Sequence, residues 1–269
     1  MQNKTKGKDG LMIHFSGIYD TQLFAQDADL SVLDVRGLSG TNCYCDDEAM
    51  QTLRGHLQGY PADGIHFLDS GNYHYMTRLW IEKIREPFRL LVFDNHTDLQ
   101  PPAFGGILSC GGWIAASLEE VPLLKEVILV GPDEAAFQAV DEEWKKRVRF
   151  FSRERLAAEG MPACISWLKE TNMDLPFYLS VDKDILSPEA LKTNWSQGDL
   201  KAEELLQILS AFYENTLKQG SHLLGMDVCG EDDPQHSTDP EKSDEINRSL
   251  LRFWRDTNSF QEHLCITNY

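Results

Sequence analysis

The sequence lacks the features that mark proteins that bind nucleic acid or cross a membrane. Its 269 residues include 25 Lys and Arg against 43 Asp and Glu, for a formal net charge of −18. A basic footprint for nucleic acid is therefore absent. No stretch approaches the roughly 20 apolar residues that a membrane-spanning helix needs. We expect neither a nucleic-acid partner nor a membrane partner.

The cysteines show no pairing pattern, and no leader segment is apparent. None of the six forms a Cys-x-x-Cys unit, which argues against a structural zinc site. The basic stretch 1–8 is not followed by the apolar segment of a signal peptide. Scattered cysteines without a leader predict reduced thiols in a cytoplasmic protein. Repeats, low-complexity tracts and Pro/Ser-rich linkers are also missing, so we predict a single α/β domain over residues 1–269.

Short apolar runs alternate with amphipathic stretches along the chain. The runs are almost continuously apolar, as in strands that are buried on both faces. We predict eight strands, at 12–16, 31–35, 64–69, 88–94, 126–131, 147–152, 177–182 and 222–228. We predict helices at 75–85, 133–146, 153–171, 200–218 and 241–257. This alternation predicts a mainly parallel sheet with helices on both faces.

Residues 91–98, Leu-Val-Phe-Asp-Asn-His-Thr-Asp, place three potential metal ligands where a buried strand should end. Asp94, His96 and Asp98 are at alternating positions, so their side chains face the same side of an extended chain. Residues 177–184 resemble this stretch and finish in Asp182 and Asp184. Ligands of open parallel sheets bind beyond the carboxyl ends of the strands. We therefore expect both motifs to contribute to one site.

Two further strand ends also carry polar residues. Asp69 to His74 follows one strand, and Asp227 and Glu231 follow another. Each motif alone could be an ordinary strand-end turn or a helix cap, but their joint occurrence predicts a metal site. Carboxylate and imidazole ligands without a thiolate suit Mn²⁺ best, with Zn²⁺, Fe²⁺ and Ni²⁺ as alternatives. Two cations roughly 3.5 Å apart can share a water and deprotonate it.

The motifs resemble those of the ureohydrolases, the family of arginase, agmatinase and formiminoglutamase. Family members carry Asp-Ala-His-x-Asp and Ser-x-Asp-x-Asp-x-x-Asp-Pro, which here are residues 94–98 and 180–188. Residues 70–75, Ser-Gly-Asn-Tyr-His-Tyr, occupy the place of the family's Gly-Gly-Asp-His-Ser. Residues 225–234 resemble its C-terminal Gly-x-Asp-x-x-Glu-x-x-Pro, with one extra residue before Glu231. The resemblance implies a three-layer α/β/α sandwich around an eight-stranded, mainly parallel sheet.

The resemblance also implies roles for individual residues. One Mn²⁺ would be held by His74, Asp94, Asp98 and Asp182, and the other by His96 and Asp184, with Asp94 and Asp182 bridging the two ions. A hydroxide between the ions would attack an amidine or guanidine carbon. Asp98 would also stabilise the tetrahedral intermediate and pass a proton to the leaving amine. Glu231 would pair with the guanidinium of the substrate.

Other positions depart from the family pattern. Where arginases carry the histidine of Gly-Asn-Leu-His-Gly, this chain has Ser109 or Cys110. A hydroxyl or thiol is a poorer proton shuttle near pH 7 than imidazole. We expect Ser109 and Cys110 to contact the substrate, although Cys110 also fits a buried small residue at a helix start. Trp195, in the segment 193–198, is expected to form a substrate wall; an ordinary loop anchored by its tryptophan is the alternative.

Together these features predict a binuclear manganese hydrolase that cleaves a C–N bond of a linear guanidine or amidine. The missing shuttle histidine keeps two alternatives open. One is a different metal-dependent amidohydrolase, such as a deacetylase-like enzyme, on the same site. The other is a metal-binding regulatory homologue without turnover. The resemblance further implies a homo-oligomer acting on a small molecule.

Overall fold

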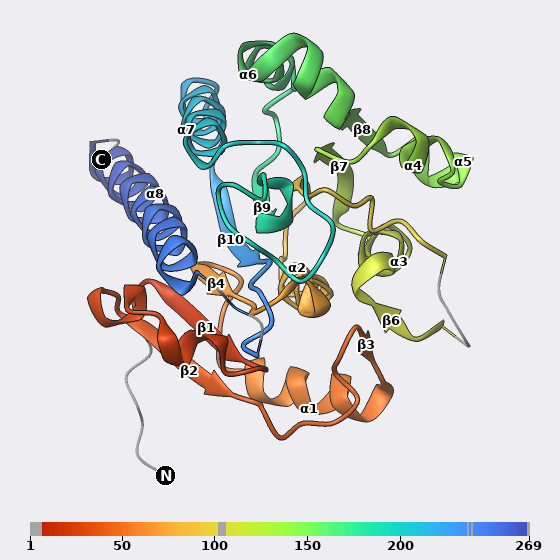
Figure 1. The fold of residues 1–269 in the computed structure, drawn as a ribbon. Helices are drawn as coiled ribbons and strands as arrows, with labels where there is room; N and C mark the ends of the chain where they lie inside the picture. Colours follow the sequence, from red (N-terminus) through yellow and green to blue (C-terminus); the bar gives the residue numbers. More distant parts are fainter. Residues whose placement is uncertain (1–6, 102–105, 236, 238, 268–269) are drawn as a thin grey trace.

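A parallel eight-stranded sheet forms the centre of the protein. In a computed structural model, residues 7–101, 106–235, 237 and 239–267 are described. All the pairings in this sheet are parallel, and the strand order is β2-β1-β4-β10-β9-β5-β7-β8 (Figure 1). The strands are β1 (Gly10–His14), β2 (Leu30–Asp34), β4 (Ile65–Phe67), β5 (Phe88–Phe93), β7 (Leu124–Val130), β8 (Val148–Phe151), β9 (Phe177–Asp182) and β10 (Leu223–Cys229). All eight predicted strands are present, at bounds close to those expected.

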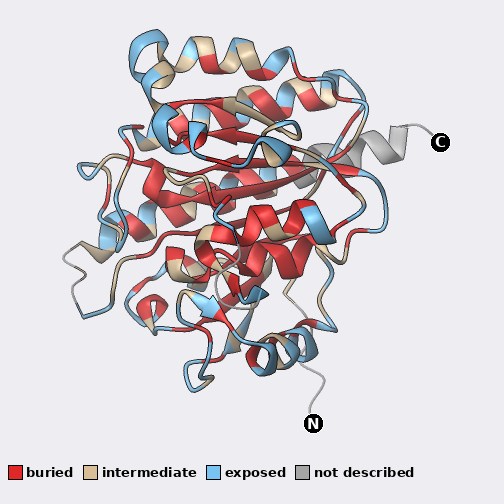
Figure 2. Ribbon diagram, turned by 90° about the vertical axis from the view of Figure 1, so that its right-hand side faces the viewer, coloured by how far each residue is buried: buried red, intermediate tan, exposed pale blue. Residues whose placement is uncertain are grey.

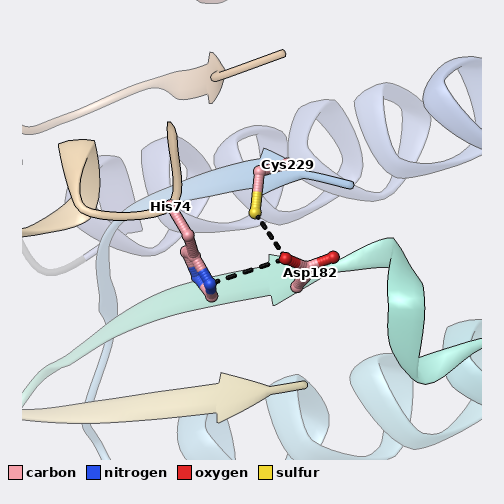
Figure 3. Close-up of side chains that lie close together, drawn as sticks. All are labelled: His74, Asp182 and Cys229. Carbon is pink, nitrogen blue, oxygen red and sulfur yellow. Dashed lines mark hydrogen bonds and ion pairs between the residues drawn. The ribbon is translucent and has the colours of Figure 1, made fainter. Parts of the chain in front are cut away.

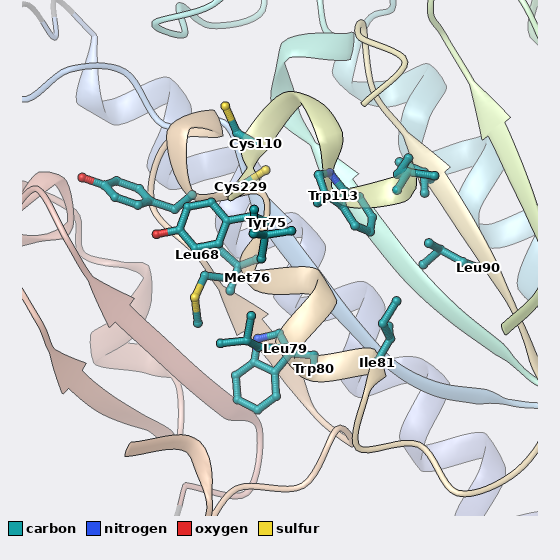
Figure 4. Close-up of a cluster of buried hydrophobic side chains, with 14 of the residues drawn as sticks. Leu68, Tyr75, Met76, Leu79, Trp80, Ile81, Leu90, Cys110, Trp113 and Cys229 are labelled. Atoms are coloured by element: carbon teal, nitrogen blue, oxygen red, sulfur yellow. The ribbon is translucent and has the colours of Figure 1, made fainter. Parts of the chain in front are cut away.

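The sheet separates two hydrophobic cores. Alternate side chains of a strand point to opposite faces, so Leu90 and Val92 of β5 pack into one core while Leu91 and Phe93 pack into the other. In the first core, His66 stacks on Trp80 with ring centroids 3.7 Å apart. Figure 4 shows the neighbouring aromatic and aliphatic side chains of this core. Burial on both faces explains why the strands read as continuous apolar runs.

Helices cover both faces and give three layers, as predicted. The first core is covered by α1 (Asp47–Leu57), α2 (Met76–Ile81), α3 (Trp113–Glu120), α4 (Glu134–Gln138) and α5 (Glu142–Lys145). The second is covered by α6 (Arg153–Lys169), α7 (Ala202–Lys218) and α8 (Pro240–Thr267). Buried strands lie between helices whose outer faces are exposed (Figure 2). Within the described residues, the structure contains no helix with the length and apolar character needed to cross a membrane.

Two predicted helices differ from the structure for local reasons. The stretch 133–146 forms two short helices because the Asp141 carboxylate accepts a hydrogen bond from the Glu143 amide and starts a second helix. Asp133 caps the first helix, as predicted, by accepting from the Ala136 amide. Helix α6 is kinked at Gly160, whose φ is 77°, two residues before Pro162.

Several shorter elements were not predicted. They include α1, α3 and a two-stranded antiparallel ladder of β3 (Tyr44–Cys45) and β6 (Leu108–Ser109). The described residues also form the 3₁₀ helices η1 (Ile18–Thr21), η2 (Phe24–Asp27), η3 (Gly71–Tyr73), η5 (Cys110–Gly112) and η6 (Lys183–Ile185). Helix α1 carries a detectable signal, because Asp46 accepts from the Ala49 amide as its cap and Leu53 and Leu57 follow on one face.

A buried ion pair joins the ends of β9 and β10 to α8. Lys183 is fully buried and pairs with Glu231, which is 1% exposed. The Lys183 Nζ also donates to Ser243 Oγ at 2.8 Å and Asn247 Oδ1 at 3.0 Å. Glu231 accepts further bonds from Gln22 Nε2 at 2.8 Å, Ser243 Oγ at 2.6 Å and Asn247 Nδ2 at 2.7 Å. Burial disfavours the Glu231 carboxylate, but the Lys183 charge and these bonds outweigh it and lower its pKa.

We predict that Lys183→Met destabilises the fold by about 3–5 kcal/mol, because the Glu231 carboxylate would remain buried without its counter-charge. Urea unfolding in the presence of a chelator measures this independently of metal binding. Lys218→Met is the matched control, since the Lys218 side chain is 74% exposed. A Lys183→Met variant within about 0.5 kcal/mol of the parent would contradict the prediction.

Candidate metal centre

The predicted ligands follow strands at the centre of the sheet. Strands β4, β10, β9 and β5 are consecutive neighbours, so their carboxyl ends open at one edge. His74 follows β4 and η3, whereas Asp94 directly follows β5. Asp182 ends β9, and Asp184 lies in η6. Segments that are far apart in sequence are therefore brought together by strand order alone.

One group of ligands gathers around His74. Its Nδ1 atom is 3.1 Å from Asp94 Oδ2, 3.1 Å from Asp98 Oδ2 and 3.6 Å from Asp182 Oδ2. The His74, Asp94 and Asp98 side chains are all buried. Four of the six predicted ligands thus surround one small volume.

A second group gathers around His96. Its Nδ1 atom is 2.8 Å from Asp184 Oδ2 and 3.5 Å from Asp94 Oδ1. Asp94 therefore directs one carboxylate oxygen toward each histidine, as a bridging ligand would. Asp182 Oδ2 faces His74, while its Oδ1 accepts from the Asp184 amide at 2.9 Å. All six predicted ligands contribute to the two groups.

The donor atoms fit cations. Three of them, His74 Nδ1, Asp94 Oδ2 and Asp184 Oδ2, are buried, and their polar neighbours are other predicted ligands: His74 faces Asp94, and Asp184 faces His96. Among the described residues, none outside the two groups forms a hydrogen bond to these three atoms. The ligand atoms of each group lie within 4.8 Å of one another. Imidazole nitrogen and carboxylate oxygen are suitable donors for divalent transition metals.

Protons would have to balance the charge of these carboxylates wherever no cation is bound. Burial, with the charges of Asp182 and Asp94, raises the pKa of Asp184 well above its usual value. Burial and the Asp94 charge raise the pKa of Asp98 to about 7. Burial disfavours protonated His96, but contacts with Asp184 and Asp94 outweigh it and raise its pKa to about 12. A divalent cation would supply the same positive charge.

Further residues fix the orientation of the ligands. His74 Nε2 lies 2.9 Å from Ser180 Oγ, which donates to Asp227 Oδ1 at 2.7 Å. Trp113 Nε1 donates to Asp98 Oδ2 at 2.6 Å. Partners of this kind hold a ligating side chain in its binding geometry. Asp227 lies in a motif singled out from the sequence, whereas Trp113 gave no recognisable signal because its contact depends on tertiary packing.

Cys229 also lies in this cluster, although no sequence motif indicated it. Its Sγ atom is 3.1 Å from Asp182 Oδ2, and the cysteine groups with His74 and Asp182 (Figure 3). In the β10–β9 register, Cys229 is opposite Asp182. Strand pairing thus places a thiol beside a donor set expected to contain only Asp and His. Burial raises the pKa of Cys229 well above its usual value.

A cavity of about 240 Å³ opens onto the ligands. Ser109, Cys110 and Trp195, the predicted substrate contacts, all line it. Trp195 Nε1 donates to Asn72 Oδ1 at 2.8 Å. His96 Nε2 lies 2.8 Å from Ser196 Oγ, so the segment 193–198 is also attached to a ligand.

Glu231 does not line the cavity. Its carboxylate is enclosed by Lys183, Gln22, Ser243 and Asn247. This placement differs from the expected pairing with a guanidinium, because Lys183 already supplies the positive charge. Asp69 also lies outside the cavity lining and the two ligand groups. Its carboxylate accepts hydrogen bonds from the Phe15 and Ser16 amides at 3.0 and 2.8 Å.

Comparison with known proteins agrees with this geometry. An uncharacterised protein of Thermotoga maritima is 32% identical over 240 residues, which cover 89% of this chain and 87% of that protein. The solved structure of proclavaminate amidino hydrolase from Streptomyces clavuligerus has a TM-score of 0.69 at 17% identity and covers 94% of each chain. An arginase-like protein of T. brucei, a triple mutant bound with Mn²⁺, has a TM-score of 0.61 at 17% identity, covering 95% of this chain and 92% of that one.

The family model for arginases matches residues 64–251, a range that contains all six ligands of the two groups. The strand order and the geometry of the predicted ligands are consistent with this match to the family model. The chain belongs to the arginase family.

Proposed function

We propose that the protein is a binuclear manganese-dependent hydrolase that cleaves a C–N bond of a linear guanidine or amidine. The observation that carries this proposal is the convergence of two ligand groups that share Asp94. One group has three carboxylates near His74, and the other has Asp184 near His96. The Mn²⁺ in the T. brucei relative supports the choice of metal.

The ions, when bound, would lower the pKa of a water between them and so supply a nucleophile at neutral pH. The side chains have separate tasks. Asp94 and Asp182 would contribute to both ion sites, and His74 and His96 would each contribute to one. Asp98, which lines the cavity beside Asp94, would stabilise the tetrahedral carbon and transfer a proton to the leaving amine. Ser109, Cys110 and Trp195, which line the same cavity, would position the substrate.

The cavity favours a substrate with an uncharged tail. Among the described residues, its lining contains no Lys or Arg, and its only carboxylates are the predicted metal ligands Asp94, Asp98, Asp182 and Asp184. A substrate carboxylate or ammonium group would thus lose water without gaining a counter-charge. Tyr44 and Trp195 offer aromatic surface, and Gln100 and Ser109 offer neutral hydrogen-bonding groups.

Metal analysis tests the centre itself. After removal of metal with a chelator and reconstitution with Mn²⁺, we expect about two ions per chain. Asp184→Ala should retain about one ion, because the His74 group stays intact. Asp94→Ala should weaken both sites, because this carboxylate faces both histidines. Equilibrium dialysis followed by elemental analysis gives the stoichiometry.

The control for these variants is Asp256→Ala, which removes an exposed carboxylate from α8. This variant should bind as many manganese ions per chain as the parent. Circular dichroism establishes that each variant is folded. A well-folded Asp94→Ala variant with two tightly bound ions, or a parent that never exceeds one ion, would refute the two-metal centre.

A substrate panel tests the chemistry. The manganese-loaded protein should release urea or ammonia from neutral-tailed alkyl guanidines or amidines. We expect kcat/KM for these to exceed that for arginine, agmatine, guanidinobutyrate or formiminoglutamate by at least about tenfold, or about 1.4 kcal/mol. Asp94→Ala and Asp182→Ala should reduce turnover to the level of the metal-free protein.

Acetylated amines in the same panel examine the deacetylase-like alternative. Release of acetate without turnover of any guanidine or amidine would replace the proposed reaction with amide hydrolysis on the same centre. Full metal loading without turnover of any compound in the panel would count against an enzyme.

A further inference from the structure

Two cysteines face each other across the small ladder beside the metal centre. In the β3–β6 pair, Tyr44 is opposite Ser109 and Cys45 is opposite Leu108. Next to the ladder, where Cys43 has a φ of 59° and Cys110 begins η5, the Cys110 amide donates to the Cys43 carbonyl at 2.9 Å. Cys43 and Cys110 are therefore neighbours across the end of the ladder, and each thiol has the largest effect on the pKa of the other.

The backbone next to the two cysteines has the spacing of a disulfide. Tyr44 and Ser109 form the adjacent ladder pair, and opposed residues of antiparallel strands have Cα atoms about 4.5–5.5 Å apart. Disulfides join cysteines whose Cα atoms are about 4.4–6.8 Å apart. The backbone hydrogen bond from Cys110 to Cys43 keeps the two cysteines next to this pair.

The pair can also be reached from the cavity. Cys43 is partly exposed and Cys110 is 9% exposed, and both line the cavity that opens onto Asp98. The other cysteines with described side chains are enclosed: Cys45 is 1% exposed, and Cys164 and Cys229 are fully buried. Within the described part of the chain, only Cys43 and Cys110 combine mutual thiol contact with access from the cavity.

A soft-metal site is the alternative use of two adjacent thiols. Such sites need three or four donors. Among the described residues, no group of three or more Cys, His, Asp or Glu with converging ligand atoms includes Cys43 or Cys110. The pair therefore lacks the further ligands that a metal ion would require. Oxidation of the two thiols to a disulfide by an external oxidant needs no further protein ligand.

We propose that Cys43 and Cys110 form a reversible disulfide in the cavity wall when the protein meets a hydroperoxide. The Cys43 thiolate attacks a peroxide oxygen, the O–O bond breaks, and an alcohol or water leaves. The Cys110 thiol then attacks the Cys43 sulfenic acid; the S–S bond forms, the S–O bond breaks and water leaves. The hydroperoxide is reduced by two electrons, and the two thiols are oxidised by two.

The environment supports Cys43 as the attacking residue. The adjacent Cys110 thiol lowers the pKa of Cys43 to about 7. Thiolates rather than thiols react with peroxides, so a lowered pKa and partial exposure both favour oxidation at this position. Cys110, which is more deeply buried and adjacent, is placed to resolve the sulfenic acid.

Non-reducing peptide mapping of the manganese-loaded protein tests the proposal without reference to activity. After treatment with hydrogen peroxide, we expect a linked peptide that joins residues 43 and 110 and disappears with dithiothreitol. Cys43→Ser should reduce this peptide to background. Cys110→Ser should leave a Cys43 sulfenic acid that dimedone traps.

Cys164→Ser is the matched control, because Cys164 is buried on α6, and this variant should form the linked peptide normally. Cys45→Ser distinguishes Cys43 from its neighbour in the same peptide and should also retain the link. Oxidation of Cys43 in the folded parent without a link to Cys110, or a link that requires Cys45, would overturn the proposal.

Discussion

The placement of several buried carboxylates within a few ångströms of one another is the constraint on which the rest of the structure depends. Asp94, Asp98, Asp182 and Asp184 cannot all ionise in a low-dielectric environment unless positive charge is present. Without cations, that charge would have to come from protons on the histidines and on some of the carboxyl groups, whose pKa values are raised. Cations would replace the protons, so pH and metal concentration would act on the same equilibrium.

The surrounding structure holds these repelling groups together through neutral hydrogen bonds and one separate ion pair. Ser180, Trp113 and Ser196 each contact a ligand without adding charge. Lys183 is the exception, because its positive charge is directed away from the ligands toward Glu231. The ion pair holds the backbone between Asp182 and Asp184 in place. The carboxylate oxygens of these two residues face His74 and His96.

Much of the fold, and the convergence of the six predicted ligands, could be predicted from the sequence. The strands were recognisable because burial on both faces leaves uninterrupted apolar runs, and the ligands because strand ends concentrate them at alternating positions. The helix breaks at Asp141 and Gly160 depend on one hydrogen bond and one backbone φ angle, respectively. The periodicity of hydrophobic residues does not detect such features. The location of Cys229 depends on register with β9, and the enclosure of Glu231 depends on α8. Both are consequences of tertiary contacts that no local pattern encodes.

The network around Lys183 also has a consequence for how the protein is made. Lys183 lies between two ligands, yet its partners are Glu231, Ser243 and Asn247, and Glu231 in turn contacts Gln22, 209 residues away in sequence. Contacts between segments so distant form late, because the entropy of closing long loops must be overcome first. During synthesis, the ligand segment therefore lacks its anchor until α8 has emerged from the ribosome. A chain that stopped before α8 would therefore carry every predicted ligand and still lack their shared support.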